Sequence, residues 1–360
     1  MRKVKLVFHV GMPKTATTYL QEQAKDISNI FYLGKDNKNR KKMFYGNIQP
    51  LHSKLFENFR AEIDAGFPNP TMNHYELIKQ YSEQIILAIK EKKNAHTFIL
   101  SDECIIDYGN YQGELNFMII ISIGEYISKR LINNIKLKNI ISITIRNQPS
   151  IIMSLYSMKL PLRMTFKEYV KRNLGEPKRG AWGAFFYSEL YSFYSLILKN
   201  DWKLVMTPFE LLDMDGDEVG FIKRAFDINS EKDLEKVQLK NYINVNSTGS
   251  GKERVNYNHR YTLIGKLGFI FFYGSRAVHS KLLNEKRHFK RLYYFFLHGL
   301  GHYLLLADRL IKKLGFAKDK ELYASKNSLN LIENLYIKDN NELKKHLPEF
   351  DLKKYGYKNK

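Results

Sequence analysis

The chain has 360 residues and carries 58 lysine and arginine residues against 37 aspartate and glutamate residues, a formal charge of +21. This length fits one large domain or a core with an appendage, and the single cysteine, Cys104, excludes an internal disulfide framework. The charge indicates an anionic partner, but no zinc-ligand spacing, RNA-recognition signature or recognition helix accompanies it, so we do not expect nucleic acid. No apolar run reaches about 18 residues, so the sequence predicts no membrane-spanning helix.

The first predicted elements are a short apolar strand over Val4–Val10, a turn containing Gly11, and a helix from about Thr17. A strand, a turn and a helix N-terminus in this order turn free backbone N–H groups toward an anion. The turn departs from the nucleotide-hydrolase pattern G-x-x-x-x-G-K-[ST], because Ala16 stands in place of the second glycine and Thr17 in place of the lysine. The lysine stands inside the loop, as Lys14. The segment therefore predicts a phosphate cradle with a displaced cation.

Further along the chain, short apolar strands alternate with helices. The predicted helices cover residues 73–93, 115–136, 150–156, 184–199 and 216–225, and the predicted strands cover 96–103, 140–145 and 202–206. This alternation predicts an α/β fold with a doubly wound parallel sheet flanked by helices. Ligands of such sheets bind at the carboxyl ends of the strands, where Lys14, Glu103 and Arg146 stand. We expect these three residues to converge.

Residues 252–320 differ in character from the rest of the chain. Two aromatic and aliphatic stretches, 263–278 and 292–306, are flanked by lysine and arginine. One interpretation is a helical hairpin that packs on the core. The other is that residues 263–310 contact a membrane surface or an acceptor, with the basic residues at the level of the headgroups. The predicted organisation is a core of residues 1–250, a basic and aromatic helical extension of residues 251–322, and a tail of residues 323–360 that packs back on the core.

The loop sequence Pro-Lys-Thr-Ala-Thr-Thr-Tyr-Leu, residues 13–20, resembles the 5′-phosphosulfate loop of sulfotransferases, usually written PKTGTTWL or PKSGTTxL. The alternative is a chance match in an ordinary strand–helix turn. Enzymes of this family use 3′-phosphoadenosine 5′-phosphosulfate (PAPS) and have a P-loop type of sheet. Ala16 replaces the usual glycine, and its methyl group is tolerated if φ stays negative. The resemblance implies that the donor's 5′-phosphate contacts Pro13, Lys14, Thr15, Ala16, Thr17 and Thr18.

A second part of the resemblance concerns the 3′-phosphate, which distinguishes PAPS from ordinary adenine nucleotides. The family binds it with an arginine at the end of a strand and a serine eight residues later, and Arg146 and Ser154 stand at that spacing. The guanidinium group offers a bidentate fork to a phosphate, and a hydroxyl two turns into the next helix adds a hydrogen bond. The pair is a weak signal alone and a strong one after the first loop.

Three further segments bear on the resemblance. Residues 204–212 are similar to a strand followed by a Glu-Asp-Leu segment in these enzymes, with Leu211 in place of the aspartate, and residues 340–357 are similar to the tails of bacterial relatives. The family closes a basic, glycine-containing loop over the donor. Residues 249–252 are a loose match to that loop, which makes Lys252 a candidate donor-binding residue.

The resemblance also implies a mechanism. Sulfuryl transfer is an in-line displacement with a loose transition state, so positioning and charge stabilisation carry the catalysis. Lys14 is the expected cation at the bridging oxygen, and no metal ion is required if protein cations neutralise the leaving phosphate. The acceptor hydroxyl needs a general base. Glu103 is the first candidate and His52 the second, although Glu103 also fits a surface carboxylate or the N-cap region of the next helix.

We therefore expect a cytoplasmic, PAPS-dependent sulfotransferase that acts on a hydroxyl group and releases adenosine 3′,5′-bisphosphate. The expected acceptor is a carbohydrate, in particular an anionic cell-surface glycan, with peptide tyrosine, lipids and small phenols as alternatives. A P-loop kinase is a second hypothesis, but it would need a lysine at position 17. A non-catalytic basic protein that binds a polyanion or a membrane is a third, and it would leave Lys14, Arg146 and Ser154 as a coincidence.

Overall fold

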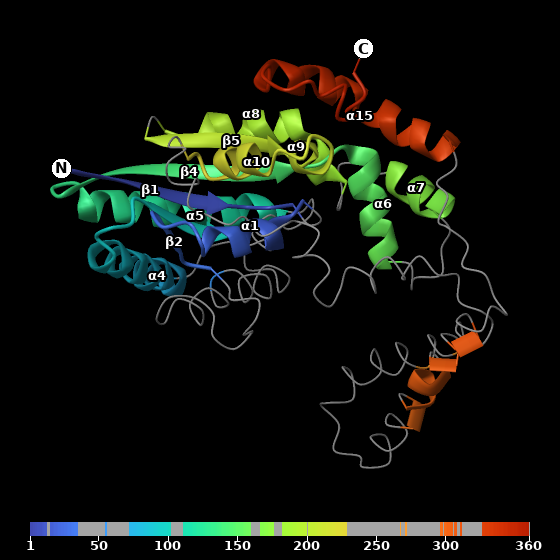
Figure 1. Ribbon diagram of the computed structural model, residues 1–360, viewed down its shortest axis with the longest axis horizontal. Coiled ribbons are helices and arrows are strands. Elements are labelled where there is room, and N and C mark those ends of the chain that lie inside the picture. The colour runs from blue at the N-terminus through green and yellow to red at the C-terminus, as the bar shows by residue number, and fades with distance from the viewer. Residues whose placement is uncertain are drawn as a thin grey trace. The chain divides into compact units, whose positions relative to one another are not determined.

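The chain folds around a parallel β-sheet flanked by helices, which confirms the predicted α/β class (Figure 1). A computed structural model describes residues 1–12, 15–34, 55, 72–101, 111–159, 166–175, 182–199, 201–228 and 326–359, with separate helical positions between 267 and 311. The chain divides into two compact units, one of residues 1–155, 166–248 and 326–360 and one of residues 156–165 and 249–325. The sheet belongs to the first unit.

Within the described residues the sheet has five strands in the order β2-β3-β1-β4-β5, and every neighbouring pair is parallel. The strands are β1 (Arg2–His9), β2 (Ile30–Tyr32), β3 (Thr97–Ser101), β4 (Ile135–Ile145) and β5 (Trp202–Pro208). The α-helices whose bounds lie within the described residues are α1 (Thr17–Ala24), α4 (Met72–Glu91), α5 (Tyr111–Leu131), α6 (Gln148–Lys159), α7 (Phe166–Leu174), α8 (Tyr187–Ile197), α9 (Glu210–Asp213), α10 (Glu218–Ala225) and α15 (Lys326–His346). Because β3, β1 and β4 are adjacent, their carboxyl ends lie side by side.

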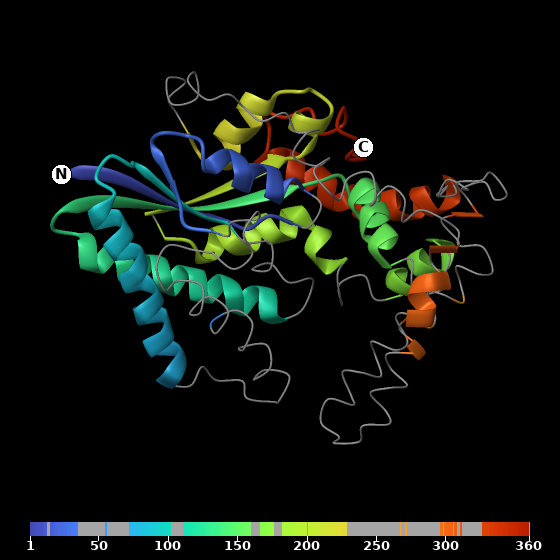
Figure 2. The same cartoon turned by 60° about the horizontal axis from the view of Figure 1, so that its bottom comes forward.

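Both faces of the sheet are covered by helices (Figure 2). On one face, apolar side chains of four strands pack with side chains of α1, α9 and α10 in a single buried cluster. On the other face, α5 lies against β4, and α15 packs on α8. A Cβ atom at Gly124 of α5 would lie 2.4 Å from the ring of Trp202. Glycine therefore lets α5 approach the sheet closely at that point.

The boundary between α5 and β4 corrects the predicted elements. The predicted helix 115–136 instead ends at Leu131, and the predicted strand 140–145 begins earlier, at Ile135. The N–H of Asn134 donates to the carbonyl of Leu131 over 3.0 Å and closes a turn. Residues 135–138 alternate apolar and basic side chains, a period of two that fits a strand with one solvated face.

Residues 326–359 contact the rest of the sheet unit through buried polar groups. The carboxylate of Asp339 accepts the backbone N–H groups of Ser188 and Glu189 over 3.1 and 3.3 Å and so caps α8. Burial raises the pKa of this carboxyl group above its ordinary value. The side chains of Asn340 and Gln148 exchange hydrogen bonds of 2.8 and 3.3 Å at the start of α6. Polar contacts, in addition to apolar packing, therefore fix the position of α15.

Candidate functional site

The turn after β1 brings the chain back over the start of α1. The N–H of Val10 donates to the carbonyl of Ser142 over 2.8 Å, so the chain leaves the sheet directly after this bond. A Cβ atom at Gly11 would lie 2.1 Å from the Oγ1 atom of Thr17 and 3.1 Å from the His9 ring. Only glycine fits this close approach, because any other side chain would displace Thr17 or His9.

Ala16 immediately precedes α1 and adopts a left-handed backbone conformation, with φ +61° and ψ +24°. The expectation that Ala16 is tolerated because its φ stays negative is therefore wrong. The left-handed region costs an L-residue about 1–2 kcal/mol, and glycine occupies it without this cost. The physical reason is the reversal between β1 and α1, which requires one left-handed residue. The alanine keeps the loop geometry at an energetic cost.

No side chain among the described residues caps the N-terminus of α1. Ala16 provides no side-chain acceptor, and the first turn contains no acidic residue. The first intrahelical hydrogen bond runs from the N–H of Leu20 to the carbonyl of Ala16 over 3.0 Å, so the N–H groups of Thr17 and Thr18 have no helix carbonyl to donate to. An uncapped N-terminus of this kind attracts anions through its N–H groups and the helix dipole.

The two threonines at this helix end differ in environment. The side chain of Thr17 is buried, and its hydroxyl oxygen has no hydrogen-bond partner within the described part of the chain. The side chain of Thr18 is exposed to solvent. A buried hydroxyl group without a partner is unfavourable by about 1–3 kcal/mol. Thr17 therefore carries a hydrogen-bonding capacity that the described residues do not satisfy.

A buried histidine joins the ends of three strands beneath the loop. Nδ1 of His9 lies 2.8 Å from the hydroxyl of Ser101 on β3, and Nε2 lies 3.5 Å from the hydroxyl of Thr144 on β4. The amide of Gln21 on α1 donates to the carbonyl and hydroxyl oxygens of Ser101, both over 3.3 Å. Burial lowers the pKa of His9 to about 3, so its ring is neutral at physiological pH.

The hydrogen bonds of Thr15 determine which group donates and which accepts in each hydrogen bond of the His9 network. Its hydroxyl donates to the carbonyl of Met12 and lies 2.7 Å from the hydroxyl of Thr144. Thr144 must therefore donate to Thr15, and Nε2–H of His9 must donate to Thr144. Nδ1 of His9 is then an acceptor, to which Ser101 donates. This one arrangement satisfies every member, and it ties the loop to β4 on both sides of residues 13 and 14.

Arg146 directly follows β4, two residues beyond Thr144. Its guanidinium carbon lies 4.7 Å from the centroid of the Phe209 ring, a cation–π distance. Phe209 belongs to the buried cluster that also contains Tyr19 and Leu20 of α1. The guanidinium group is therefore on the same face of the sheet as α1. Ser154 lies two turns into α6, and its side chain is half-buried.

A buried carboxylate that the sequence did not identify as a site residue supports Arg146. Oε1 of Glu210 accepts the backbone N–H and the side-chain amide of Asn147, each over 2.8 Å, and Oε2 accepts the hydroxyl of Tyr357 over 3.1 Å. Burial raises the pKa of the Glu210 carboxyl group, and these hydrogen bonds oppose the rise. Asn147 also accepts the N–H of Ser150 over 3.0 Å and so caps α6. Glu210 thus fixes the peptide that follows Arg146.

The candidate residues divide into those that the structure describes and those that it does not. Thr15, Ala16 and Thr17 surround the start of α1, and Thr15 is tied to the strand that carries Arg146. Five candidates lie outside the described residues: Pro13, Lys14, His52, Glu103 and Lys252. The expected convergence of Lys14, Glu103 and Arg146 therefore stays a prediction. The adjacency of β3, β1 and β4 agrees with it.

His9, Thr144 and Glu210 were not identified as site residues from the sequence. The available signal was a polar side chain at the carboxyl end of an otherwise apolar strand, which applies to His9 and Thr144. Comparison of the chain with protein-family models gave no match, and neither did comparison with curated protein sequences. The function must therefore be argued from the residues themselves.

Proposed function

We propose that this chain is a PAPS-dependent sulfotransferase with a P-loop type of sheet, acting on a hydroxyl group of an anionic glycan. The observation that carries the proposal is the start of α1. There a left-handed residue precedes a helix that no described side chain caps, and the buried hydroxyl of Thr17 has no partner in the same part of the chain. The resemblance of residues 13–20 to the phosphosulfate loop gives this anion site a specific occupant.

The two phosphate groups of the donor are assigned to two adjacent strands. The 5′-phosphate lies against the N–H groups and hydroxyls of Thr17 and Thr18. The 3′-phosphate is held by Arg146 and Ser154, which follow β4 at the spacing seen in the family. The position of the Arg146 guanidinium on the α1 face of the sheet supports this assignment. Asn147 and Glu210 then act as positioning residues for the arginine.

The proposed reaction is a displacement at sulfur. The acceptor oxygen forms a bond to sulfur while the bond from sulfur to the bridging phosphate oxygen breaks. The electron pair of the broken bond leaves on the 5′-phosphate of adenosine 3′,5′-bisphosphate, where Lys14 stabilises the developing charge. The acceptor's proton passes to a general base, Glu103 or His52. Neutral His9 and its hydrogen-bonded neighbours hold the loop and do not exchange protons in this scheme.

Ligand binding tests the proposal most directly. A ligand that binds only the native state raises the melting temperature, so adenosine 3′,5′-bisphosphate should do so more than 5′-AMP at equal concentration. Arg146→Ala should weaken bisphosphate binding by about 10- to 100-fold, because it removes charge-assisted hydrogen bonds, and should leave 5′-AMP binding unchanged. Arg130→Ala, at an exposed arginine of α5, is the matched control and should bind both nucleotides normally.

Replacement of the partnerless hydroxyl separates binding from stability. Thr17→Val keeps the shape of the side chain and removes an unsatisfied polar group, so the free protein should be as stable as the wild type or more so. The same variant should bind both nucleotides more weakly. A melting shift with ATP and Mg²⁺ but none with the bisphosphate would point to a kinase instead. Absence of a shift with every nucleotide would refute a donor site at α1.

A further inference from the structure

Five lysines lie on one face of the sheet at its amino edge, which is the end at which the strands begin. Lys3 pairs in register with Lys136, and Lys5 pairs with Lys138, across the β1–β4 interface. Lys203 of β5 pairs in register with Ile140, which lies two positions after Lys138 in β4. Aligned residues of parallel strands share a face, and so do residues two apart in one strand. We call these five residues the lysine ladder; they occupy three adjacent strands.

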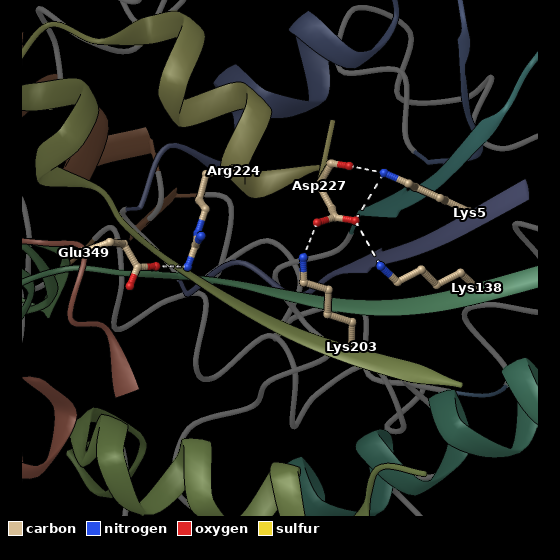
Figure 3. A network of polar contacts seen from close by, with 6 residues as sticks. All are labelled: Lys5, Lys138, Lys203, Arg224, Asp227 and Glu349. Atoms are coloured by element: carbon tan, nitrogen blue, oxygen red, sulfur yellow. Dashed lines mark hydrogen bonds and ion pairs between the residues drawn. The ribbon is translucent and has the colours of Figure 1, made fainter. Parts of the chain in front are cut away.

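Asp227, just beyond α10, is the carboxylate that the ladder shares (Figure 3). It pairs with Lys5 over 3.2 Å, with Lys138 over 3.6 Å, and with Lys203. Burial opposes ionisation of Asp227, but the lysines outweigh this and lower the pKa of its carboxyl group. Lys5 also donates to the backbone carbonyl of Asp227. Three of the five lysines pair with this one carboxylate, so the five lysines and Asp227 together carry a net charge of four.

The outer part of the ladder is open to solvent. Lys3 and Lys136 are exposed, and neither has an ion-pair partner among the described residues. Like charges that face each other directly across strands destabilise a sheet. The fold nevertheless keeps two such pairs side by side. Ile132, in the turn just before β4, lies at the same edge with 65% of its surface exposed.

We propose that the lysine ladder is a docking surface for an anionic phospholipid bilayer. Lysine ammonium groups are flexible, strongly hydrated point charges, which suit a diffuse field of negative headgroups. Ile132 at the rim adds an apolar contact of the kind that enters the headgroup region. A nucleic acid or glycan chain is better recognised by arginine forks and aromatic platforms, and the ladder contains neither. This proposal does not depend on the sulfotransferase activity.

Vesicle co-sedimentation of the full chain tests the surface. We expect the protein to pellet with phosphatidylcholine vesicles that contain phosphatidylserine, to stay in solution with phosphatidylcholine alone, and to be released by about 1 M salt, where the screening length falls to about 3 Å. Lys3→Gln together with Lys136→Gln should weaken binding by about 30-fold, because each lysine near an anionic surface contributes about fivefold. Lys3→Gln alone should weaken it by about fivefold.

A charge-matched control separates the ladder from the net charge of the whole chain. Lys79→Gln together with Lys345→Gln removes the same charge from α4 and α15, and should change binding by less than about threefold. Neither double variant should melt below the wild type by more than a few degrees, and Lys3→Gln with Lys136→Gln relieves a like-charge pair. Equal losses in the two double variants would assign binding to the overall charge and overturn the proposal. It would also fail if the wild type ignored phosphatidylserine vesicles, or if it bound soluble hyaluronate in preference to them.

Discussion

At the carboxyl edge of the sheet, where the strands end, the polar side chains are buried and neutral and form hydrogen bonds with one another. At the amino edge, where the strands begin, the polar side chains are charged lysines that largely face solvent. His9 and Thr144 illustrate the first edge, and Lys3 and Lys136 the second, on the same two strands. The difference follows from burial, because a charge can stay at an edge that water reaches but is costly where α1 and the loop exclude water. The same strands therefore carry a neutral hydrogen-bonded network at one end and a cationic surface at the other.

The largest effect that tests this comparison is the pH dependence set by His9. Its pKa in the folded state is about 3, against 6.5 for the ordinary imidazole, so below pH 6.5 the unfolded chain binds a proton that the folded chain refuses. The contribution of neutral His9 to the free energy of unfolding is fully present above pH 6.5 and is lost as the pH is lowered toward 3. The loss between pH 7 and pH 5 should be about 2 kcal/mol, from a slope of about 1.4 kcal/mol per pH unit.

Denaturant unfolding at a series of pH values measures this loss. His9→Gln should flatten the profile between pH 7 and pH 5, whatever its effect on stability at pH 7. His346→Gln, at the end of α15, is the control and should keep the wild-type slope. If His9→Gln kept the wild-type slope, His9 would be accessible to protons and the neutral hydrogen-bonded chain would be wrong, because the raised pKa values of Glu210 and Asp339 act on both proteins alike.

A smaller effect is expected at the amino edge, from Asp227→Asn. The residue has φ +51°, a conformation that asparagine tolerates well, so the change tests the charge and not the backbone. Loss of the shared carboxylate should destabilise the fold by about 1 kcal/mol at low salt, a modest value because Lys138 and Lys203 are 47% and 44% exposed. Added salt should recover part of this loss, because it screens the repulsion among the lysines.

The matched control is Glu349→Gln, which breaks the exposed ion pair with Arg224 in the same region (Figure 3). Urea unfolding at low and high salt should show a weaker effect for this variant than for Asp227→Asn. If the two variants behave alike, Asp227 is an ordinary surface carboxylate. The amino edge would then not depend on a single buried counter-charge.

The smallest effect has the opposite sign and concerns the loop. Ala16→Gly should stabilise the protein by about 0.5 kcal/mol, because glycine has no Cβ atom to clash at φ +61°, while its greater freedom in the unfolded chain offsets part of the gain. Ala24→Gly, at the end of α1, should destabilise it, since that residue is buried and helical. Thermal unfolding compares the two. A loss of stability in Ala16→Gly would show that the left-handed conformation does not strain the loop.

The sequence predicted the elements that have a clear period and missed those that depend on tertiary contacts. The α/β class and the strand–loop–helix unit at the start of the chain followed from local pattern. The three-residue strand β2 did not, because it exists only through its pairing with β3. The start of β4 was placed too late, since alternating lysines there resemble a polar helix end when the neighbouring strand is unknown. Helices α7 and α15 were not anticipated.

The candidate site divides along the same line. Arg146 and Ser154 were named as candidates because their spacing is local and resembles a family pattern, and their role stays a prediction. The partners of His9 are 92 and 135 residues away, so no sequence window contains them together. Glu210 is 63 residues from Asn147, and its hydrogen bonds appear only in the folded chain. Residues that touch an expected ligand can be predicted from a motif, whereas those that hold them in place need the fold.

The contacts of residues 326–359 also determine which parts of the structure can form before the ribosome has finished the chain. Glu210 must wait for Tyr357, which is 147 residues later, and Gln148 must wait for Asn340, which is 192 residues later. The strands can pair as soon as residue 208 has left the ribosome, but Glu210, which positions the peptide after Arg146, still lacks one partner. Contacts this distant in sequence form slowly. A nascent chain would therefore hold an assembled sheet before Glu210 has all of its hydrogen-bond partners.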